Sequence, residues 1–351
     1  MRVWAAGLLV MFNACGGEAP ARPQWVVTVA TDAPIPHLGD RLLVRVLYED
    51  TGKLCGDGCS RVLAVDDPAD WPVTFGVAEH AAGRALVVRA QLFRAGAISP
   101  DGAPVAGSSI EAAGRLATSQ LRPALVLATG CFGVVDADAR STCDAASQTL
   151  VPIADLPAVS DAIPQPGSWP PAATVPCASA PPAGMVCVPG GALIVGSVTA
   201  PVQLQDLSLA ATPERLAVLS PFAIDVDEVT VGAVRPLIDA IGAGSPGVGT
   251  GKATGCSYLG PVDTSHDAMP LNCVTRAFAA AVCKHFGKRL PSETEWEMAA
   301  SRRTAESTYP WGEDDDVCGH AIVAHGDKTT LEDASCLAGD VVQSPGVVAG
   351  G

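Results

Sequence analysis

The chain is poor in basic residues. Lysine and arginine total 22 against 37 aspartates and glutamates, which gives a formal net charge of −15 at pH 7 over 351 residues. A chain with this imbalance is repelled by phosphate backbones, so its composition argues against nucleic-acid binding. The chain also lacks the polybasic stretch that draws proteins to anionic lipids. The simplest consequence of the acidic charge is solubility.

Charged residues of either sign are scarce, at 17%, whereas hydrophobic residues make up 48%. Most of the chain should therefore fold, and its length allows two domains with a core each. Common catalytic patterns are missing: the six histidines form no HExxH and no partner for a nucleophile elbow. The glycine-rich stretch 247–253 is no phosphate loop, because Pro246 stands where glycine is needed and Ala253 replaces the hydroxyl residue.

The first 15 residues resemble a targeting signal. Arg2 gives a positive start, and the apolar run Val3–Phe12 is too short to span a bilayer. A small residue then precedes Cys15, as at a bacterial lipoprotein cleavage site. We expect residues 1–15 to be a lipoprotein-type signal peptide and Cys15 to carry the lipid, with plain secretion or an uncleaved anchor as alternatives. Lipidation and plain secretion both place the mature chain outside the cytoplasm. As a lipoprotein it would lie in the cell envelope, attached to the membrane only through an N-terminal lipid.

Cysteines are numerous, with twelve in the chain. An extracytoplasmic location favours disulfides, and finger-like spacing for zinc is missing. Setting Cys15 aside leaves an odd number, and Cys283 has no nearby partner. Sequence alone does not fix the connectivity. The candidates for local disulfides are Cys55 with Cys59, Cys131 with Cys143, Cys177 with Cys187, Cys256 with Cys273, and Cys318 with Cys336.

Residues 19–151 are predicted to form an all-β sandwich. Short β-branched or alternating runs are separated by Gly, Pro and Asp turns, and no helical period appears. No catalytic constellation is evident, so we interpret this region as a folded spacer or binding module. The expected strands are 25–30, 41–48, 71–77, 84–93 and 124–127.

Residues 152–183 are predicted to be a linker, because nine prolines fall between 152 and 182. Such a composition favours an extended, semi-rigid spacer. After it, the Pro-Gly-Gly turn at 189–191 between two apolar runs predicts a β-hairpin of residues 185–188 and 192–197. Further strands are expected at 216–219 and 222–226.

Helices are predicted in the second region from their end signals. One begins at Thr230 or nearer Pro236, which would kink a helix that started early. A clearer one runs from Thr275 to Phe286, with an apolar stripe and a stop at Gly287. A third follows Pro291: Ser292 and Glu295 have the spacing of a capping box, in which each side chain bonds the other residue's amide.

Several separated motifs resemble one family, the formylglycine-generating enzymes or sulfatase-modifying factors. The strongest is the segment Gly287–Ala300, GKRLPSETEWEMAA. In order along the chain, the others are MVCVPGG at 185–191, FAIDVDEVT at 222–230, MPLNCV at 269–274, AAAVC at 279–283 and YPWG at 309–312. The resemblance covers about residues 184–340. It implies an α+β, C-type-lectin-like fold for residues 184–351, with the C-terminal part of that domain lacking.

Complete family members oxidise a cysteine of a sulfatase to formylglycine with oxygen and copper, and they bind calcium. Their cysteine pair lies near the end of the domain, in the part that we expect this sequence to lack. The resemblance therefore assigns no catalytic, cofactor-binding or metal residue to this chain. In such proteins the cysteine at the position of Cys283 pairs with one near that end, so the resemblance implies that Cys283 is unpaired here; the alternative is a buried free cysteine that acts as a small apolar residue. A calcium position would fall at 319–322, where His320 and Ala321 replace the usual Asn. Copper would need thiolate ligands close together.

The acidic residues of the second region have structural explanations. Helix-start electrostatics favour Glu293, Glu295 and Glu297, and the run 314–316 is expected to be a solvated loop rather than a calcium site. The sequence thus predicts an envelope lipoprotein whose sulfatase-modifying factor domain is catalytically incomplete. The alternative is a non-catalytic recognition module for a polypeptide or glycan.

Overall fold

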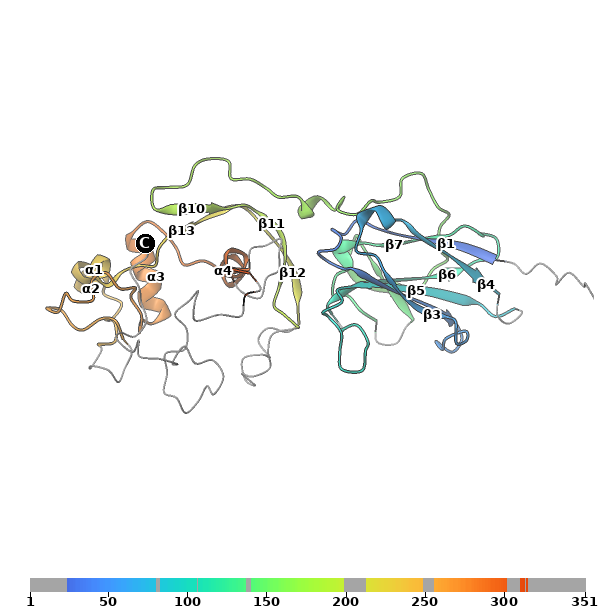
Figure 1. The fold of residues 1–351 in the computed structure, drawn as a ribbon, viewed down its shortest axis with the longest axis horizontal. Coiled ribbons are helices and arrows are strands. Elements are labelled where there is room, and N and C mark those ends of the chain that lie inside the picture. Colours follow the sequence, from blue (N-terminus) through green and yellow to red (C-terminus); the bar gives the residue numbers. More distant parts are fainter. Residues whose placement is uncertain are drawn as a thin grey trace, which may run out of the picture.

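The structure is a computed structural model that describes residues 24–79, 83–105, 107–136, 140–198, 213–248, 256–301, 310–312 and 314. It is mostly β-structure with few and short helices. Figure 1 shows the strands β1 to β9 gathered in one body and the helices α1 to α3 at the opposite end, with two pairs of strands between them. Within these described residues, every helix is too short or too polar to cross a membrane.

Two sheets form the first body. One has the order β4-β1-β7, in which β1 pairs antiparallel with β4 and parallel with β7. The other has the order β3-β2-β5-β6 and is antiparallel throughout. The strands are β1 (Gln24–Thr31), β2 (Arg41–Tyr48), β3 (Ser60–Ala64), β4 (Val73–Ala78), β5 (Leu86–Phe93), β6 (Ser109–Leu116) and β7 (Ala124–Leu127).

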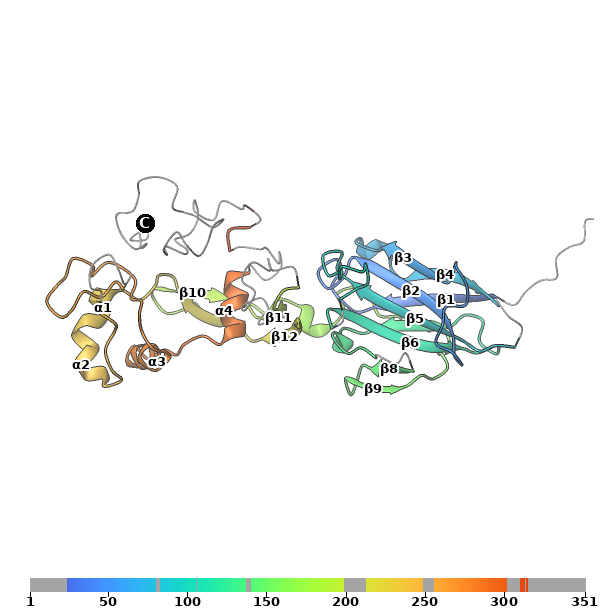
Figure 2. The same cartoon turned by 90° about the horizontal axis from the view of Figure 1, so that it is seen from below.

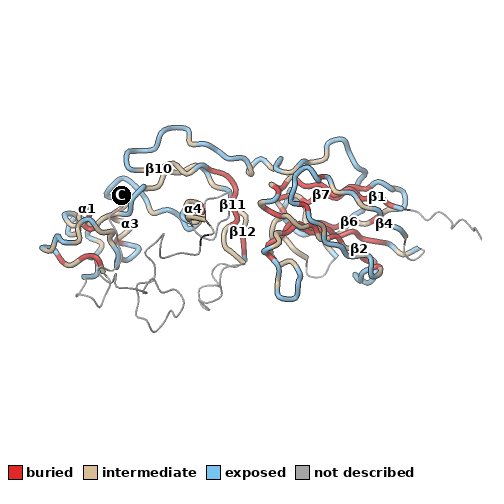
Figure 3. The backbone as a smooth tube through the Cα atoms, in the orientation of Figure 1, coloured by how far each residue is buried: buried red, intermediate tan, exposed pale blue. Residues whose placement is uncertain are grey.

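A shared apolar core holds these two sheets together. Alternate residues of each strand point into it, such as Val27 and Val29 from β1 and Leu42 from β2, all of them fully buried. Figure 3 shows this burial as red strands inside the first body, and Figure 2 shows the sheets from below. The strands that the sequence predicts in this region are confirmed, within a few residues, as β1, β2, β4, β5 and β7.

The outer face of β5 is covered as well. All eight of its residues are buried, because the hairpin of β8 (Ser141–Asp144) and β9 (Thr149–Pro152) lies beside β6. The polar side chains of β5 on this face therefore need partners inside the protein. Their network is described below.

The sequence predicts that the proline-rich segment is an extended spacer. In the structure, part of this segment is instead bound to the first body. The Leu156 side chain enters the core, and its backbone bonds Arg115 at 2.9 Å. Further along, the Gly167 amide donates to Ala33 and the Trp169 amide to Asp32. Proline lacks an amide hydrogen, but the other residues of the segment keep theirs, and all keep their carbonyls. These groups can bond the free backbone groups at a strand edge, so the segment binds there.

The predicted hairpin of 185–188 with 192–197 is wrong. β10 (Met185–Val188) pairs with β13 (Phe222–Asp225), whereas β11 (Gly191–Val195) pairs with β12 (Arg215–Leu219). The chain changes sheet at Gly190, whose backbone bonds Val175 in both directions. A Cβ atom at Gly190 would lie 2.5 Å from the Leu219 carbonyl oxygen, so only glycine fits this crossing.

The helices follow their end signals. Thr230 caps α1 (Val231–Val234), and Pro236 interrupts the helix before α2 (Ile238–Ile241). The predicted helix from Thr275 is confirmed as α3 (Arg276–His285), and the predicted capping box begins α4 (Glu293–Ala300). A small second core, centred on Val234, Phe278 and Val282, packs α1 and α3 together.

Candidate functional site

The segment Gly287–Ala300, called the signature segment below, is the centre of the candidate site. Its helix α4 starts where the sequence predicts: the Glu295 amide donates to Ser292 Oγ at 3.1 Å. In return the Ser292 amide donates to Glu295 Oε2 at 2.8 Å. Both halves of the capping box are present, so the first turn of the helix is fixed by its own side chains.

Glu295 has a second partner within the signature segment. The two terminal nitrogens of Arg289 donate to its two carboxylate oxygens, at 2.6 and 2.5 Å. This paired hydrogen bond, helped by the Ser292 amide, lowers the pKa of Glu295 to about 2, although burial of the carboxylate opposes the shift. Glu295 is therefore ionised at neutral pH and is not suited to act as a general acid.

Two further charges of the signature segment bind it to the strands. Glu297 Oε1 accepts a hydrogen bond from the Gly196 amide at 2.7 Å, just after β11. The ammonium group of Lys288 forms an ion pair with Asp225 at the end of β13. Each contact joins the segment to a different strand pair, so these charged groups position α4.

Arg235 holds a long loop in a way that the sequence analysis missed. Its Nε donates to Asp267 Oδ1 at 2.8 Å, and its terminal nitrogens donate to the carbonyls of Gly260 and Asp263. The guanidinium also lies over the Tyr258 ring, 5.4 Å from the centroid. An arginine just before a helix-breaking proline, followed by a loop with two aspartates, is the only sequence signal for this arrangement.

The motif at 269–274 also has a structural role. Asn272 Oδ1 accepts from the Ser257 amide at 2.7 Å, and the Ser257 hydroxyl bonds the Asn272 amide at 3.1 Å. The disulfide between Cys256 and Cys273 closes the same loop. The carbonyl of Met269 accepts from the Val231 amide at 2.8 Å. The motif therefore fastens the loop to the start of α1.

Four of the five expected disulfides lie within the described residues, and all four are formed. They are Cys55–Cys59, Cys131–Cys143, Cys177–Cys187 and Cys256–Cys273. The fifth candidate pair, Cys318 and Cys336, lies outside the described residues, as does the predicted lipidation site Cys15. The eight cysteines of these four disulfides therefore have no free thiol that could bind a metal.

Cys283 on α3 is the free cysteine of the described part of the chain. Burial raises the pKa of its thiol, and the nearby Asp225 carboxylate adds to the shift. Copper chemistry of the family's kind needs soft sulfur ligands close together. Because Cys283 is the one thiol in the described segments, these residues do not fit a copper ion.

The remaining candidates are only partly visible. Among the described residues, no group of three or more His, Cys, Asp or Glu side chains is placed to hold a metal. Asp314 is described, and its carbonyl accepts from the Trp311 indole at 2.9 Å. The other residues of the calcium expectations lie outside the described residues: Asp315, Asp316, His320 and Ala321.

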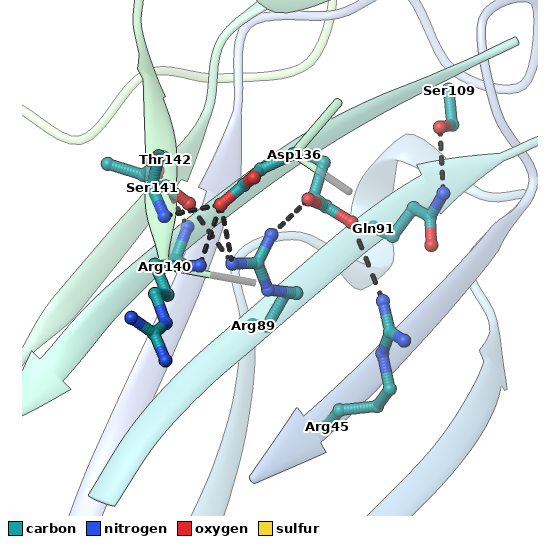
Figure 4. A network of polar contacts seen from close by, with 10 residues as sticks. Arg45, Arg89, Gln91, Ser109, Asp136, Arg140, Ser141 and Thr142 are labelled. Carbon is teal, nitrogen blue, oxygen red and sulfur yellow. Dashed lines mark hydrogen bonds and ion pairs between the residues drawn. The ribbon is translucent and has the colours of Figure 1, made fainter. Parts of the chain in front are cut away.

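A charge network lies between the outer face of β5 and β6 and the start of β8 (Figure 4). Arg89 on β5 is only 2% exposed and donates to Glu111 on β6, while its other nitrogen reaches the Ser141 carbonyl at 3.0 Å. Asp136 lies 4.0 Å from Arg89, and Arg45 lies 3.5 Å from Glu111. Two cations thus face two anions, a balance that buried charges require. Sequence reasoning missed it, because three of these residues occupy ordinary positions of strands, Asp136 lies in a loop, and the partners are far apart in the sequence.

Comparison with known proteins places the second half of the chain. Residues 171–334 match the family model of the Sulfatase-modifying factor enzyme 1-like domain. A protein named formylglycine-generating enzyme, from Thermomonospora curvata, is 29% identical over 161 residues, which cover 37% of this chain and 52% of that relative. The second half therefore carries a formylglycine-generating enzyme-like domain of the sulfatase-modifying factor family. The match spans about half the length of the relative.

Proposed function

We propose that this chain is an envelope lipoprotein whose sulfatase-modifying factor domain uses its signature segment as scaffold rather than as chemistry. The observation that supports this most is the engagement of the segment's charges. Glu295 is bound by Arg289 and Ser292, and Glu297 by the Gly196 amide. A group that already serves as a cap or a strand anchor is poorly placed to transfer protons.

For the fold, we propose a β-sandwich in the first body and a C-type-lectin-like architecture in the second. The sandwich is supported by two sheets around one core. The lectin-like proposal is supported by the family match together with short helices packed beside two-stranded sheets and long loops.

The relative's name indicates that it generates formylglycine, and this chain matches only about half of it. We propose that the chain is catalytically incomplete, because copper oxidation needs thiolates close together and Cys283 is the one free cysteine among the described residues. The test is to incubate it with copper, oxygen and a cysteine-containing sulfatase peptide, and to follow aldehyde formation by mass spectrometry. We expect no aldehyde, and Cys283→Ser should behave identically. Aldehyde formation by the natural chain would overturn the proposal, and its loss in Cys283→Ser would identify this thiol as catalytic.

Lipid attachment through Cys15 is the second part of the proposal. It is supported by the short apolar run before a small residue and cysteine. Expression in a bacterium followed by membrane fractionation tests it: the natural chain should sediment with membranes after a high-salt wash, and Cys15→Ser should not. An equal membrane fraction for both would contradict lipidation at this residue.

The alternative is a recognition module for a polypeptide or glycan. The exposure of Trp296 favours it, since this side chain on α4 is 60% exposed and large exposed aromatics are common in binding surfaces. Binding of the same sulfatase peptide without aldehyde formation, reduced by Trp296→Ala but not by the neighbouring Glu293→Gln, would favour this reading.

A further inference from the structure

A pocket of about 390 Å³ opens on the first body, far along the sequence from the signature segment. Its floor is apolar: Leu47 of β2 and Val87 of β5 are paired across the sheet and are almost fully buried. Arg115 of β6 continues the same cross-strand row, because it pairs with Val87. Ile153, just after β9, closes the side. The volume is in the range of small-molecule sites.

The rim of the pocket carries both hydrogen-bond donors and acceptors. The acidic residues Glu49 and Asp50 line it, as do the basic residues Arg115 and Arg140. Arg115 is already engaged, since it donates to Glu49 at 2.9 Å and to Asp155 at 2.8 Å. Asp50 is likewise paired with Arg84. These residues form a fixed frame around the opening.

Arg140 differs from the rest of this frame. Its backbone is held on both sides: its amide donates to Asp136 at 2.7 Å, and its carbonyl accepts from the Ile153 amide at 3.4 Å. Asp136 belongs to the buried network, so the anchor is itself rigid. Figure 4 shows the Arg140 guanidinium directed away from that network. Among the described residues, the hydrogen bonds of Arg140 are made by its backbone, and its guanidinium has no ion-pair or hydrogen-bond partner. Among the described residues that line the pocket, Arg140 is therefore the uncommitted cation.

The chemistry of the rim limits what the pocket can take. A simple anion would bind Arg140 alone and would leave the acceptor oxygens of Glu49 and Asp50 without a donor from the ligand. A sugar hydroxyl is both a donor and an acceptor, so it can serve carboxylates and guanidiniums together. The apolar floor suits the C–H face of a sugar ring, and the Arg140 guanidinium, unpaired among the described residues, suits one carboxylate.

We propose that this pocket binds an acidic monosaccharide unit, a uronic acid, with its carboxylate on Arg140 and its hydroxyls on Glu49 and Asp50. The pocket lies in the first body, outside the region of the family match. If this pocket does not bind a uronic acid, the proposed scaffold role of the signature segment is unaffected.

The test is an amide-shift titration of the full chain by nuclear magnetic resonance with glucuronate and, separately, with glucose, which has the same ring without the carboxylate. Saturable shifts of Gly52 and Val87, which line the pocket, are expected with glucuronate. Glucose should bind about tenfold more weakly, as expected for the loss of a charged hydrogen bond.

Variants assign the carboxylate to its partner. Arg140→Gln should weaken glucuronate about tenfold, to the level of glucose. Arg61→Gln, which changes an exposed arginine outside the pocket lining, should leave binding unchanged. Absence of saturable shifts, shifts confined to residues elsewhere, or equal binding by Arg140→Gln would each overturn the proposal. Tighter binding of alanine than of glucuronate would also overturn it, because the site would then select a zwitterion.

Discussion

Arg94 and Glu214 form an ion pair across the junction between the two parts of the chain. Arg94 follows β5, Glu214 precedes β12, and their side chains are 21% and 2% exposed. The second oxygen of Glu214 accepts from the Val198 amide at 3.1 Å. Beside the pair, Ile194 and Leu216 pack into the core of the first body. The β11–β12 pair is thus fastened to the first body by charge and by apolar contact.

Removing one member of this pair should destabilise the protein strongly. Arg94→Ala leaves Glu214 buried without its cation, and we expect a loss of about 3 to 5 kcal/mol in the free energy of unfolding. Urea unfolding followed by circular dichroism measures it. Arg122→Ala, at an exposed arginine, is the control and should change the free energy little.

Replacing both members with apolar residues tests whether the loss of stability in Arg94→Ala comes from the unpaired buried charge. Arg94→Met combined with Glu214→Leu should recover most of the stability that Arg94→Ala loses, because no buried charge is left unpaired. If Arg94→Ala unfolds at the same urea concentration as the natural chain, the pair does not couple the two parts.

The strands of the first body were predictable where their residues favour extended structure. β2 has alternating apolar positions that match the two faces of a sheet, and its bounds agree with the prediction. β6 was missed because its sequence, SIEAAGRL, has low strand propensity. It is a strand because it pairs with β5 along all eight residues, and this long-range pairing is invisible in a local pattern.

The candidate site shows the same division. The capping box of Ser292 and Glu295 was predictable because both residues lie within one helix turn. The contact of Glu297 with Gly196 was not, because 101 residues separate them in the sequence. The predicted pairing of β10 was wrong for the same reason. The turn sequence predicts a local hairpin, but the chain passes into another sheet at Gly190, and β10 pairs with β13.

Arg235→Lys should loosen the loop that this arginine holds. A lysine ammonium cannot reproduce the forked contacts to Asp267 and to the carbonyls of Gly260 and Asp263. We expect a loss of about 1 to 3 kcal/mol and faster amide hydrogen exchange in residues 256–273. Arg276→Lys, at an exposed position of α3, should change neither quantity. Unchanged exchange in Arg235→Lys would show that the Cys256–Cys273 disulfide is sufficient to hold the loop.

Cys283 should react slowly with alkylating reagents in the folded protein. Only the thiolate reacts, and burial together with the Asp225 carboxylate raises the pKa of this thiol, so the thiolate fraction at neutral pH is small. Iodoacetamide labelling of the Cys283 peptide, followed by mass spectrometry, should therefore accelerate only at alkaline pH. Asp225→Asn should move that acceleration to lower pH. Rapid labelling of the natural chain at neutral pH would contradict the raised pKa of this partly buried thiol.

Glu295 should make the stability depend on acid pH. Its pKa is lowered from 4.5 to about 2 in the folded protein, so its ionised form stabilises the fold above the unfolded value. That stabilisation is lost as the pH falls through about 2. Glu295→Gln keeps an oxygen for the Ser292 amide but removes the charge that binds Arg289. Urea unfolding across this pH range should therefore show a shallower acid dependence in Glu295→Gln than in the natural chain. Glu293→Gln, exposed in the same helix turn, should keep the full dependence, because the effect requires the paired Arg289 and not merely a negative charge near the start of α4.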